Sequence, residues 1–204
     1  MEHGFTTNHV ELAGCILSEL VFSHKSYGES FDQFLLGVDR KSGYQDQLQI
    51  ILSERLVAAE KPTIGDEVRI RGQIRTYNEL EEGRNRLNIV VFAREFEFVD
   101  PLEKPYHENH VMLEGFLCKK PLRRMSPLGR EICDMMLAVN RMYNKSDYIP
   151  CIAWGRNARF SGDLEIGTRL IVTGRIQSRE YRKHEEDGAI KSKVAYEVSV
   201  LKLE

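Results

Sequence analysis

The sequence predicts an all-β protein made of two similar domains joined in tandem. Three observations support this prediction. The chain repeats itself after about a hundred residues, each copy contains short stretches rich in apolar and β-branched residues, and two prolines separate the copies. Apolar residues make up 42% of the 204 residues, which is enough to form a core in each copy. We therefore expect two small globular domains.

The two copies match in the same order along their length. The matching residues, first copy and then second, are 8–12 and 109–113, Gly14 and Gly115, Arg40 and Arg141, Asp46 and Asp147, Arg55 and Arg156, and 72–74 and 174–176. Between the copies lie Pro101 and Pro105, which suit a short, stiff linker. This pattern predicts a first domain over 1–100, a linker over 101–108 and a second domain over 109–204.

The second copy shows the order of elements most clearly. Strands are predicted over 110–117, 131–141, 148–154, 167–181 and 194–201, a loop over 119–130, a short helix over 157–164 and a charged hairpin loop over 182–192. Five strands with one short helix between the third and fourth is the order of an OB-fold, a Greek-key barrel with a face that commonly binds oligonucleotides. SH3-like barrels have a similar order. We predict two tandem OB-folds, each with one short helix.

Charge is divided unequally between the two copies. Residues 1–102 contain 11 basic and 17 acidic side chains, a net charge of −6, whereas residues 103–204 contain 18 and 14, a net charge of +4. The overall charge of −2 argues against a simple polybasic DNA binder. The basic second copy is the better candidate for contacting a phosphate backbone.

Metal, disulfide, membrane and secretory signatures are not found in the sequence. The four cysteines form no C-x-x-C pair and are expected to be reduced, buried thiols, and the six histidines show no metal-ligand spacing. No apolar run approaches the roughly 18 residues of a membrane span, and the N-terminus does not read as a signal peptide. We expect a cytoplasmic protein that uses no cofactor and no metal.

Three segments of the second copy carry a resemblance to a known family. They are residues 137–143 (LAVNRMY), 148–156 (YIPCIAWGR) and 174–181 (GRIQSREY), and residues 109–115 (NHVMLEG) and 196–198 (YEV) also fit. Together they resemble the bacterial single-stranded DNA-binding protein family. The resemblance implies that aromatic side chains stack on bases at four positions, which in this sequence are Tyr143, Tyr148, Trp154 and Tyr181.

Strand geometry supports part of this set independently. Tyr148 and Trp154 are six residues apart, an even spacing that places both on one face of a strand. On the long strand that follows, Arg175, Arg179 and Tyr181 share the face opposite the apolar positions. Alternating arginines and aromatics suit single strands, because every base has a face on which to stack and cations hold the phosphates. A Trp or Tyr in a β-domain is otherwise often a packing residue.

Further cations extend the candidate surface. We expect Arg141 and Arg156 to contact phosphates alongside Arg175 and Arg179. The basic loops add Arg123, Arg124 and Lys183 as candidates, although charged side chains in such loops are also common as solvated surface. This completes the predicted nucleic-acid-binding set.

The first copy departs from the aromatic pattern. At the four corresponding positions it has Ser42, Gln47, Ser53 and Glu79, with only Tyr44 and Tyr77 as nearby aromatic side chains. Together with its net charge of −6, this pattern predicts a domain kept for pairing or stability. We expect it to make at most weak contact with DNA.

The predicted function is sequence-independent binding of single-stranded DNA in replication, recombination or repair, with RNA as an alternative ligand. Because the resembling family presents four OB-folds to DNA, we expect a homodimer. Members of that family often have an acidic C-terminal tail that recruits other proteins. No such tail follows the last predicted strand in this sequence, so we do not expect recruitment through a tail. An OB-fold module for protein interaction or oligomerisation in a primosome-like assembly is the alternative. A nuclease is disfavoured because the carboxylates are scattered and no phosphate-binding loop is present.

Overall fold

The computed structural model describes residues 7–81, 83–100, 108–184, 188 and 190–204. The described residues form two halves. The elements of the first half are β1 (Asn8–Ile16), β2 (Val21–Ser26), β3 (Glu29–Asp39), β4 (Gln45–Ser53), the 3-10 helix η1 (Glu54–Val57), β5 (Glu67–Glu81) and β6 (Arg84–Phe98). Those of the second half are β7 (Asn109–Leu117), β8 (Leu122–Met125), β9 (Glu131–Asn140), β10 (Ser146–Trp154), α1 (Gly155–Gly162), β11 (Arg169–His184) and β12 (Ile190–Leu203).

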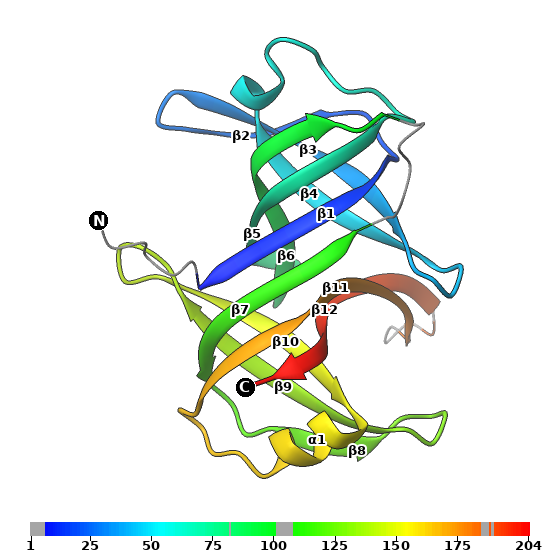
Figure 1. Ribbon diagram of the computed structural model, residues 1–204, viewed down its shortest axis with the longest axis vertical. Coiled ribbons are helices and arrows are strands. Elements are labelled where there is room, and N and C mark those ends of the chain that lie inside the picture. Colours follow the sequence, from blue (N-terminus) through cyan, green and yellow to red (C-terminus); the bar gives the residue numbers. More distant parts are fainter. Residues whose placement is uncertain (1–6, 82, 101–107, 185–187, 189) are drawn as a thin grey trace.

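Each half is a closed OB-fold barrel, as the sequence predicts (Figure 1). In the first half β1 pairs with both β5 and β3, and β4 closes the barrel by pairing in parallel with β6. In the second half β7 pairs with both β11 and β9, and β10 pairs in parallel with β12. The repeated glycines permit this closure, since a Cβ on Gly14 or Gly115 would lie 2.2 or 2.4 Å from a carbonyl oxygen of the crossing strand.

The two barrels join through their first strands. β1 and β7 pair antiparallel, and Val10 lies opposite Val111, the equivalent residue of the other copy. All twelve strands found in the described residues therefore form one continuous hydrogen-bonded sheet (Figure 1). Because equivalent residues face each other across the junction, the two halves are related by an approximate two-fold axis.

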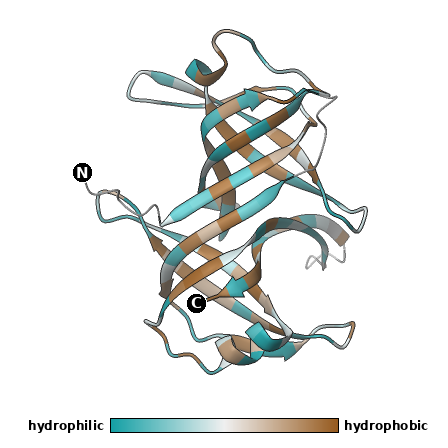
Figure 2. Cartoon of the chain, viewed as in Figure 1, coloured by the Kyte–Doolittle hydropathy of each residue, from teal (hydrophilic) through white to brown (hydrophobic). Residues whose placement is uncertain are grey.

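Apolar side chains fill the barrels in the alternating pattern expected for strands. The burial of β7 and β10 alternates along each strand, and Figure 2 shows the same alternation of hydrophobic and hydrophilic residues on the ribbon. The largest fully buried side chains are Leu, Ile and similar residues from both copies, for example Leu12 and Leu113. Packing of these alternating faces accounts for the two cores that the composition predicts.

The repeated asparagine at the start of each copy extends the sheet ladder. Asn8 Nδ2 donates to the Ile74 carbonyl at 2.8 Å, and Asn8 Oδ1 accepts from the Ile74 N–H at 2.8 Å. Asn109 makes the same pair of bonds with Ile176, at 2.7 and 2.9 Å. A side-chain amide thereby satisfies backbone groups of β5 and β11 beyond the last paired residue of β1 and β7.

Several element boundaries differ from the sequence prediction. The described residues show six strands in each half rather than five, because β2 and β8 add an edge strand, and β8 lies within the predicted loop over 119–130. The helix α1 begins and ends two residues earlier than predicted. The first half has a 3-10 turn in place of an α-helix. The long hairpin of β11 and β12 takes up most of the predicted loop over 182–192. The predicted linker over 101–108 lies almost wholly outside the described residues.

No helix in the described ranges is long and apolar enough to cross a membrane.

Candidate nucleic-acid interface

A wide groove runs across the outer face of the second barrel. It has a volume of about 1210 Å³ and is lined by side chains of β8 to β12 and of the loops beside them. Small-molecule pockets are typically about 300–1,000 Å³, so this groove has room for a longer ligand. Its cationic lining consists of Arg40, Arg124, Arg130, Arg175 and Arg179. Its acidic lining consists of Glu180 and Glu197.

Trp154 forms part of the groove wall. It is the last residue of β10 and precedes α1 with an extended backbone, φ −125° and ψ 144°. Its indole Nε1 donates a hydrogen bond of 3.1 Å to the Ser199 hydroxyl on β12. This hydrogen bond from the indole N–H holds the half-buried ring in place in the groove wall. A fixed aromatic ring in a cationic groove is suited to stacking on a base.

Arg175 lies beside Trp154 across the sheet. It pairs with Ser199 in the β11–β12 ladder, and Ser199 is the partner of the Trp154 indole. Arg175 Nε is buried and has no hydrogen-bond partner among the described residues. An unsatisfied buried N–H of a cation is costly, and other atoms of this half-buried side chain line the groove.

Arg179 and Tyr181 continue the same face toward the end of β11. The Arg179 guanidinium carbon is 5.9 Å from the centre of the Tyr181 ring, a cation–π distance. Arg179 Nε is also 3.8 Å from Glu197, and more than half of the Arg179 side chain remains exposed. Tyr181 is partly exposed beside the groove rather than within its lining. Arg175 and Arg179 share one face of β11, as the period-two pattern predicts, and the structure brings Trp154 into the same groove.

The first half also contributes to this groove. Arg40, Ser42 and Tyr44, from the turn between β3 and β4, line the groove of the second barrel. The Arg40 guanidinium carbon lies 4.6 Å from the centre of the Tyr44 ring, and Arg40 donates to the Ser178 carbonyl of β11 at 3.2 Å. In Figure 1 this turn lies beside the β11–β12 hairpin. The binding surface of the second barrel therefore includes a cation–aromatic pair from the first.

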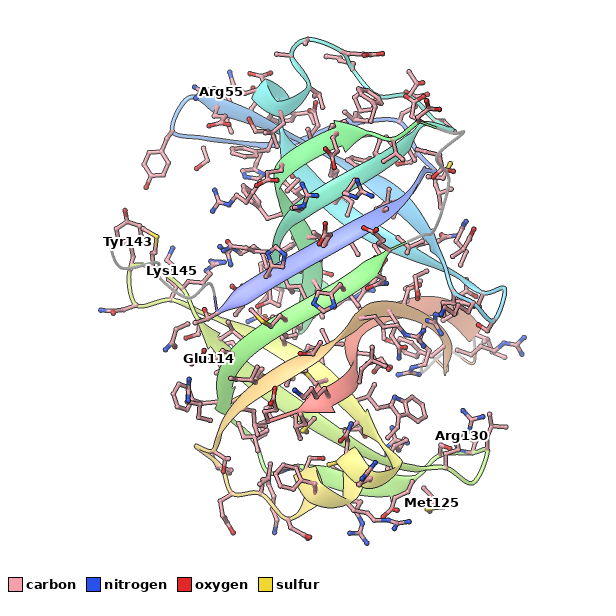
Figure 3. The ribbon with its side chains drawn as sticks, viewed as in Figure 1. Arg55, Glu114, Met125, Arg130, Tyr143 and Lys145 are labelled. Carbon is pink, nitrogen blue, oxygen red and sulfur yellow. The ribbon has the colours of Figure 1, made fainter. Side chains whose placement is uncertain are left out.

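Like Tyr181, the other two predicted tyrosines, Tyr148 and Tyr143, lie outside the groove lining. Tyr148 is 48% exposed on the same strand face as Trp154, and its backbone N–H donates to the Thr76 hydroxyl at 3.0 Å. Tyr143 is 87% exposed in the turn after β9, with a positive φ of 61°. Figure 3 shows Tyr143 and Lys145 projecting from the opposite side of the molecule from Arg130. Their roles in binding stay predictions.

Several predicted phosphate contacts are occupied by ion pairs. Arg141 bonds to the buried Asp147 at 3.2 Å, at the boundary between the halves. Arg124 and Arg123 pair with Asp134 at 2.6 Å and with Glu131 at 3.0 Å. Arg141 is therefore held as a structural cation, whereas Arg124 lies in the groove while paired.

The remaining predicted cations are at the margins of the site. Arg156 is exposed on α1, next to Trp154. The side chain of Lys183 lies outside the described residues. Neither position is tested by the geometry.

The sequence reasoning missed Arg40, Tyr44, Arg130 and Gln177 as groove-lining residues. Tyr44 was visible as an aromatic residue of the first copy, but nothing in its local pattern assigns it to the second barrel. That assignment depends on how β1 and β7 pair. The paired first strands turn the β3–β4 loop of one barrel toward β11 of the other.

The described residues contain no group of three or more His, Cys, Asp or Glu side chains arranged to hold a metal ion. Cys118, Cys133 and Cys151 are free thiols. Cys133 and Cys151 are buried as expected, whereas Cys15 and Cys118 are only partly buried. Complete burial raises the pKa of the Cys151 thiol to about 12.

Comparison with known proteins points to one family. Residues 108–204 match the model of the Single-strand binding protein family. The chain is 34% identical over 84 residues to Single-stranded DNA-binding protein B of Bacillus subtilis and covers 74% of it. It is 36% identical over 80 residues to Single-stranded DNA-binding protein 2 of Listeria innocua and covers 50% of it. These alignments take in 38% and 36% of the present chain, and the chain spans about half the length of most such relatives.

A solved structure resembles both halves at once. The wild-type single-stranded DNA-binding protein of Thermus aquaticus superposes with a TM-score of 0.75, at 20% identity, over 97% of this chain and 91% of that one. At that identity the likeness concerns the fold. It shows that the arrangement of two OB-folds in one chain occurs in another protein.

Proposed function

The chain belongs to the single-strand binding protein family, and we propose on that basis that it binds single-stranded DNA without sequence preference. In this proposal the protein covers single strands during replication, recombination or repair and catalyses no reaction. The groove of the second barrel is its main binding surface. The observation that carries the proposal is the placement of Trp154, Arg175 and Arg179 in one groove.

The geometry supports binding by stacking and charge pairing. A base stacks on the exposed side of the Trp154 ring, which its bond to Ser199 keeps in a fixed orientation. The adjoining phosphates lie against Arg175 and Arg179. Stacking is worth about 1–3 kcal/mol per base and does not depend on base identity, so it gives affinity without sequence specificity.

Unpaired strands fit this surface better than duplexes. Stacking on Trp154 requires a base face that is free of its neighbours, and a duplex would have to be opened to supply one. We include single-stranded RNA as a second ligand, since the proposed contacts do not involve the sugar.

We further propose that two chains associate into a homodimer. The outer face of β7 presents Met112, near the approximate two-fold axis, and Phe116, near the far end of the strand, and both are partly exposed. Glu114 lies between these two apolar side chains and pairs with Arg169 at 2.6 Å, and Arg71 pairs with Glu11 at 2.9 Å on the neighbouring strands. A face with internal two-fold character suits a self-complementary contact with a second copy. Such a dimer presents four OB-folds to DNA.

The experiment that tests the main proposal is a direct titration. Binding of an oligo(dT) is compared with that of a duplex of equal length at one salt concentration, since affinities for nucleic acids depend on salt. We expect tighter binding to the single strand. Equal affinity for both, or no binding to either, would refute the proposal and favour a protein-interaction module.

A further inference from the structure

The first barrel carries an aromatic surface at the same place in its fold as the groove of the second barrel. Register identifies the equivalent positions. Phe31 pairs with Ser53, as Ile132 pairs with Trp154. Phe92 is paired with both Ile51 and Gln73, as Ser199 is paired with both Ile152 and Arg175.

These equivalences show that the first copy has aromatic side chains at other positions of the same face. Ser53 replaces Trp154, but Phe92 replaces Ser199, the residue that holds the Trp154 indole. Phe31 likewise replaces Ile132 on the neighbouring strand. Comparing the two copies at the Trp154 position reveals only a missing aromatic residue. Phe31 and Phe92 lie on other strands, so that comparison does not include them. We name the surface formed by His24, Phe31, Ile51, Phe92 and Arg94 the Phe92 face.

The rings of the Phe92 face already stack on flat cationic or heteroaromatic groups. His24 lies over Phe31 with ring centres 4.8 Å apart and an angle of 8° between the rings. The Arg94 guanidinium carbon lies 5.0 Å from the centre of the Phe92 ring. Phe31 and Phe92 pack with Ile51 and Val90 in a small apolar cluster separate from the main core. His24 and Arg94 are exposed and Phe92 is partly exposed, so a ligand reaches these groups from solvent.

The exposed cation of the Phe92 face is Arg94, and Glu29 lies at the edge of the face, where it accepts a hydrogen bond from Ser53 and pairs with Arg55. Burial lowers the pKa of Arg75, Asp147 opposes that effect, and Arg141 and Arg94 lower the pKa further as neighbouring cations. Arg75 and Arg141 both pair with the buried Asp147, and Arg94 is the further cation that acts on Arg75. The glutamates of β6 lie beyond the register shift at Gly72, where Glu95 and Glu97 pair with Arg71 and Arg69. Arg94 therefore supplies a cation beside the Phe92 ring within a copy whose net charge is −6.

We propose that the Phe92 face is a second surface for single-stranded nucleic acid, on which bases stack against Phe92 and His24 and Arg94 contacts phosphate. The inference rests on the proposed function of the chain, and it adds a site at positions where the family's aromatic pattern is absent. It departs from the expectation that the first copy serves only pairing or stability. The occupant is a further stretch of the strand bound in the groove of the second barrel.

The test uses the single tryptophan to separate the two surfaces. Trp154 reports on the groove alone, whereas the number of nucleotides covered per chain reports on both surfaces. The test variant is Phe92→Leu with Arg94→Ala, which keeps an apolar side chain in the cluster. Its matched control is Phe160→Leu with Lys61→Ala, a pair at exposed positions outside the groove lining and the Phe92 face. A second test variant, Arg94→Glu, changes one exposed side chain and leaves the cluster intact.

We expect each chain of either test variant to cover about 4–16 fewer nucleotides, which is the number that one OB-fold binds. Affinity for an oligo(dT) long enough for both surfaces should fall about tenfold for the double variant, while quenching of Trp154 by an oligonucleotide of about 8 nucleotides stays as in the control. Thermal melting establishes that each variant is folded. Coverage and affinity equal to the control in both test variants would overturn the proposal. If the unchanged protein shows no Trp154 quenching and no binding, the proposed function itself fails.

Discussion

Asp147, in the second half, accepts a hydrogen bond of 2.7 Å at Oδ1 from the backbone N–H of Thr76 in the first half. The approximate two-fold axis repeats the contact, because Asp46 Oδ1 accepts from the N–H of Ser178 at 2.8 Å. Both carboxylates are completely buried, and each pairs with the arginine six residues before it. These paired carboxylates fasten the two barrels together.

Replacing Asp147 by Asn should destabilise the protein strongly. The change leaves Arg75 and Arg141 without their buried counter-charge, and breaking a buried ion pair typically costs about 3 kcal/mol or more. Asp134→Asn is the control, since it removes an exposed pair with Arg124 and should cost below about 1 kcal/mol. Denaturant unfolding measures both, and similar losses in the two variants would contradict a fastening role for Asp147.

Trp154 fluorescence should change when oligo(dT) is added. The ring lines the groove, and the sequence has one Trp, so the signal has a single source. Stacking of a base on the indole is expected to quench the emission. Unchanged emission, under conditions in which a filter assay detects binding, would place the DNA away from the groove.

Binding should weaken steeply as salt rises. Each phosphate that an arginine neutralises releases about 0.7 counterion from a single strand, so Arg175→Ala should reduce the salt slope by about 0.7. Lys202→Ala is the control, because Lys202 pairs with Glu204 at 2.9 Å and lies outside the groove lining. Equal slopes in the two variants would argue against a phosphate contact at Arg175.

Tyr44→Ala should lower affinity although Tyr44 belongs to the first copy. From the sequence alone we expected changes at Tyr44 and Tyr77 to matter far less than changes at Trp154 and Tyr181. Because Tyr44 lines the groove of the second barrel, its loss should now cost about fivefold or more, the lower end for one stacked base. Tyr27→Ala, at the exposed tip of the β2–β3 hairpin, is the control. Matching affinities of the two variants would remove Tyr44 from the site.

Light scattering at micromolar concentration should show a particle of twice the chain mass of 23.6 kDa. Met112→Glu should convert it to a single-chain particle, since a charge on the outer face of β7 opposes close contact with a second copy. A single-chain mass for the unchanged protein would refute the homodimer.

The sequence predicted what depends on local pattern. Period-two alternation placed Arg175 and Arg179 on one face of β11, and the repeat identified Asn8, Asp46 and their equivalents as paired positions. It did not reveal what the repeated aspartates do, because their partners lie in the other copy. Tyr44 and Phe92 were missed for the same reason: their neighbours are set by strand pairing between distant segments. The short strand β8 was missed because Pro121 and Pro127 flank it in a loop-like composition.

The pairing of Val10 with Val111 has a consequence for direction. The two ends of single-stranded DNA differ. A symmetric dimer of identical OB-fold chains presents the same two surfaces to a strand whichever way the strand runs. Because the two barrels here belong to one chain, their sequences differ: Trp154 lies on one side of the approximate axis and Phe92 on the other. A strand that enters from one barrel therefore meets the two surfaces in a different order from one that enters from the opposite barrel. The departure from exact symmetry gives each chain a built-in polarity.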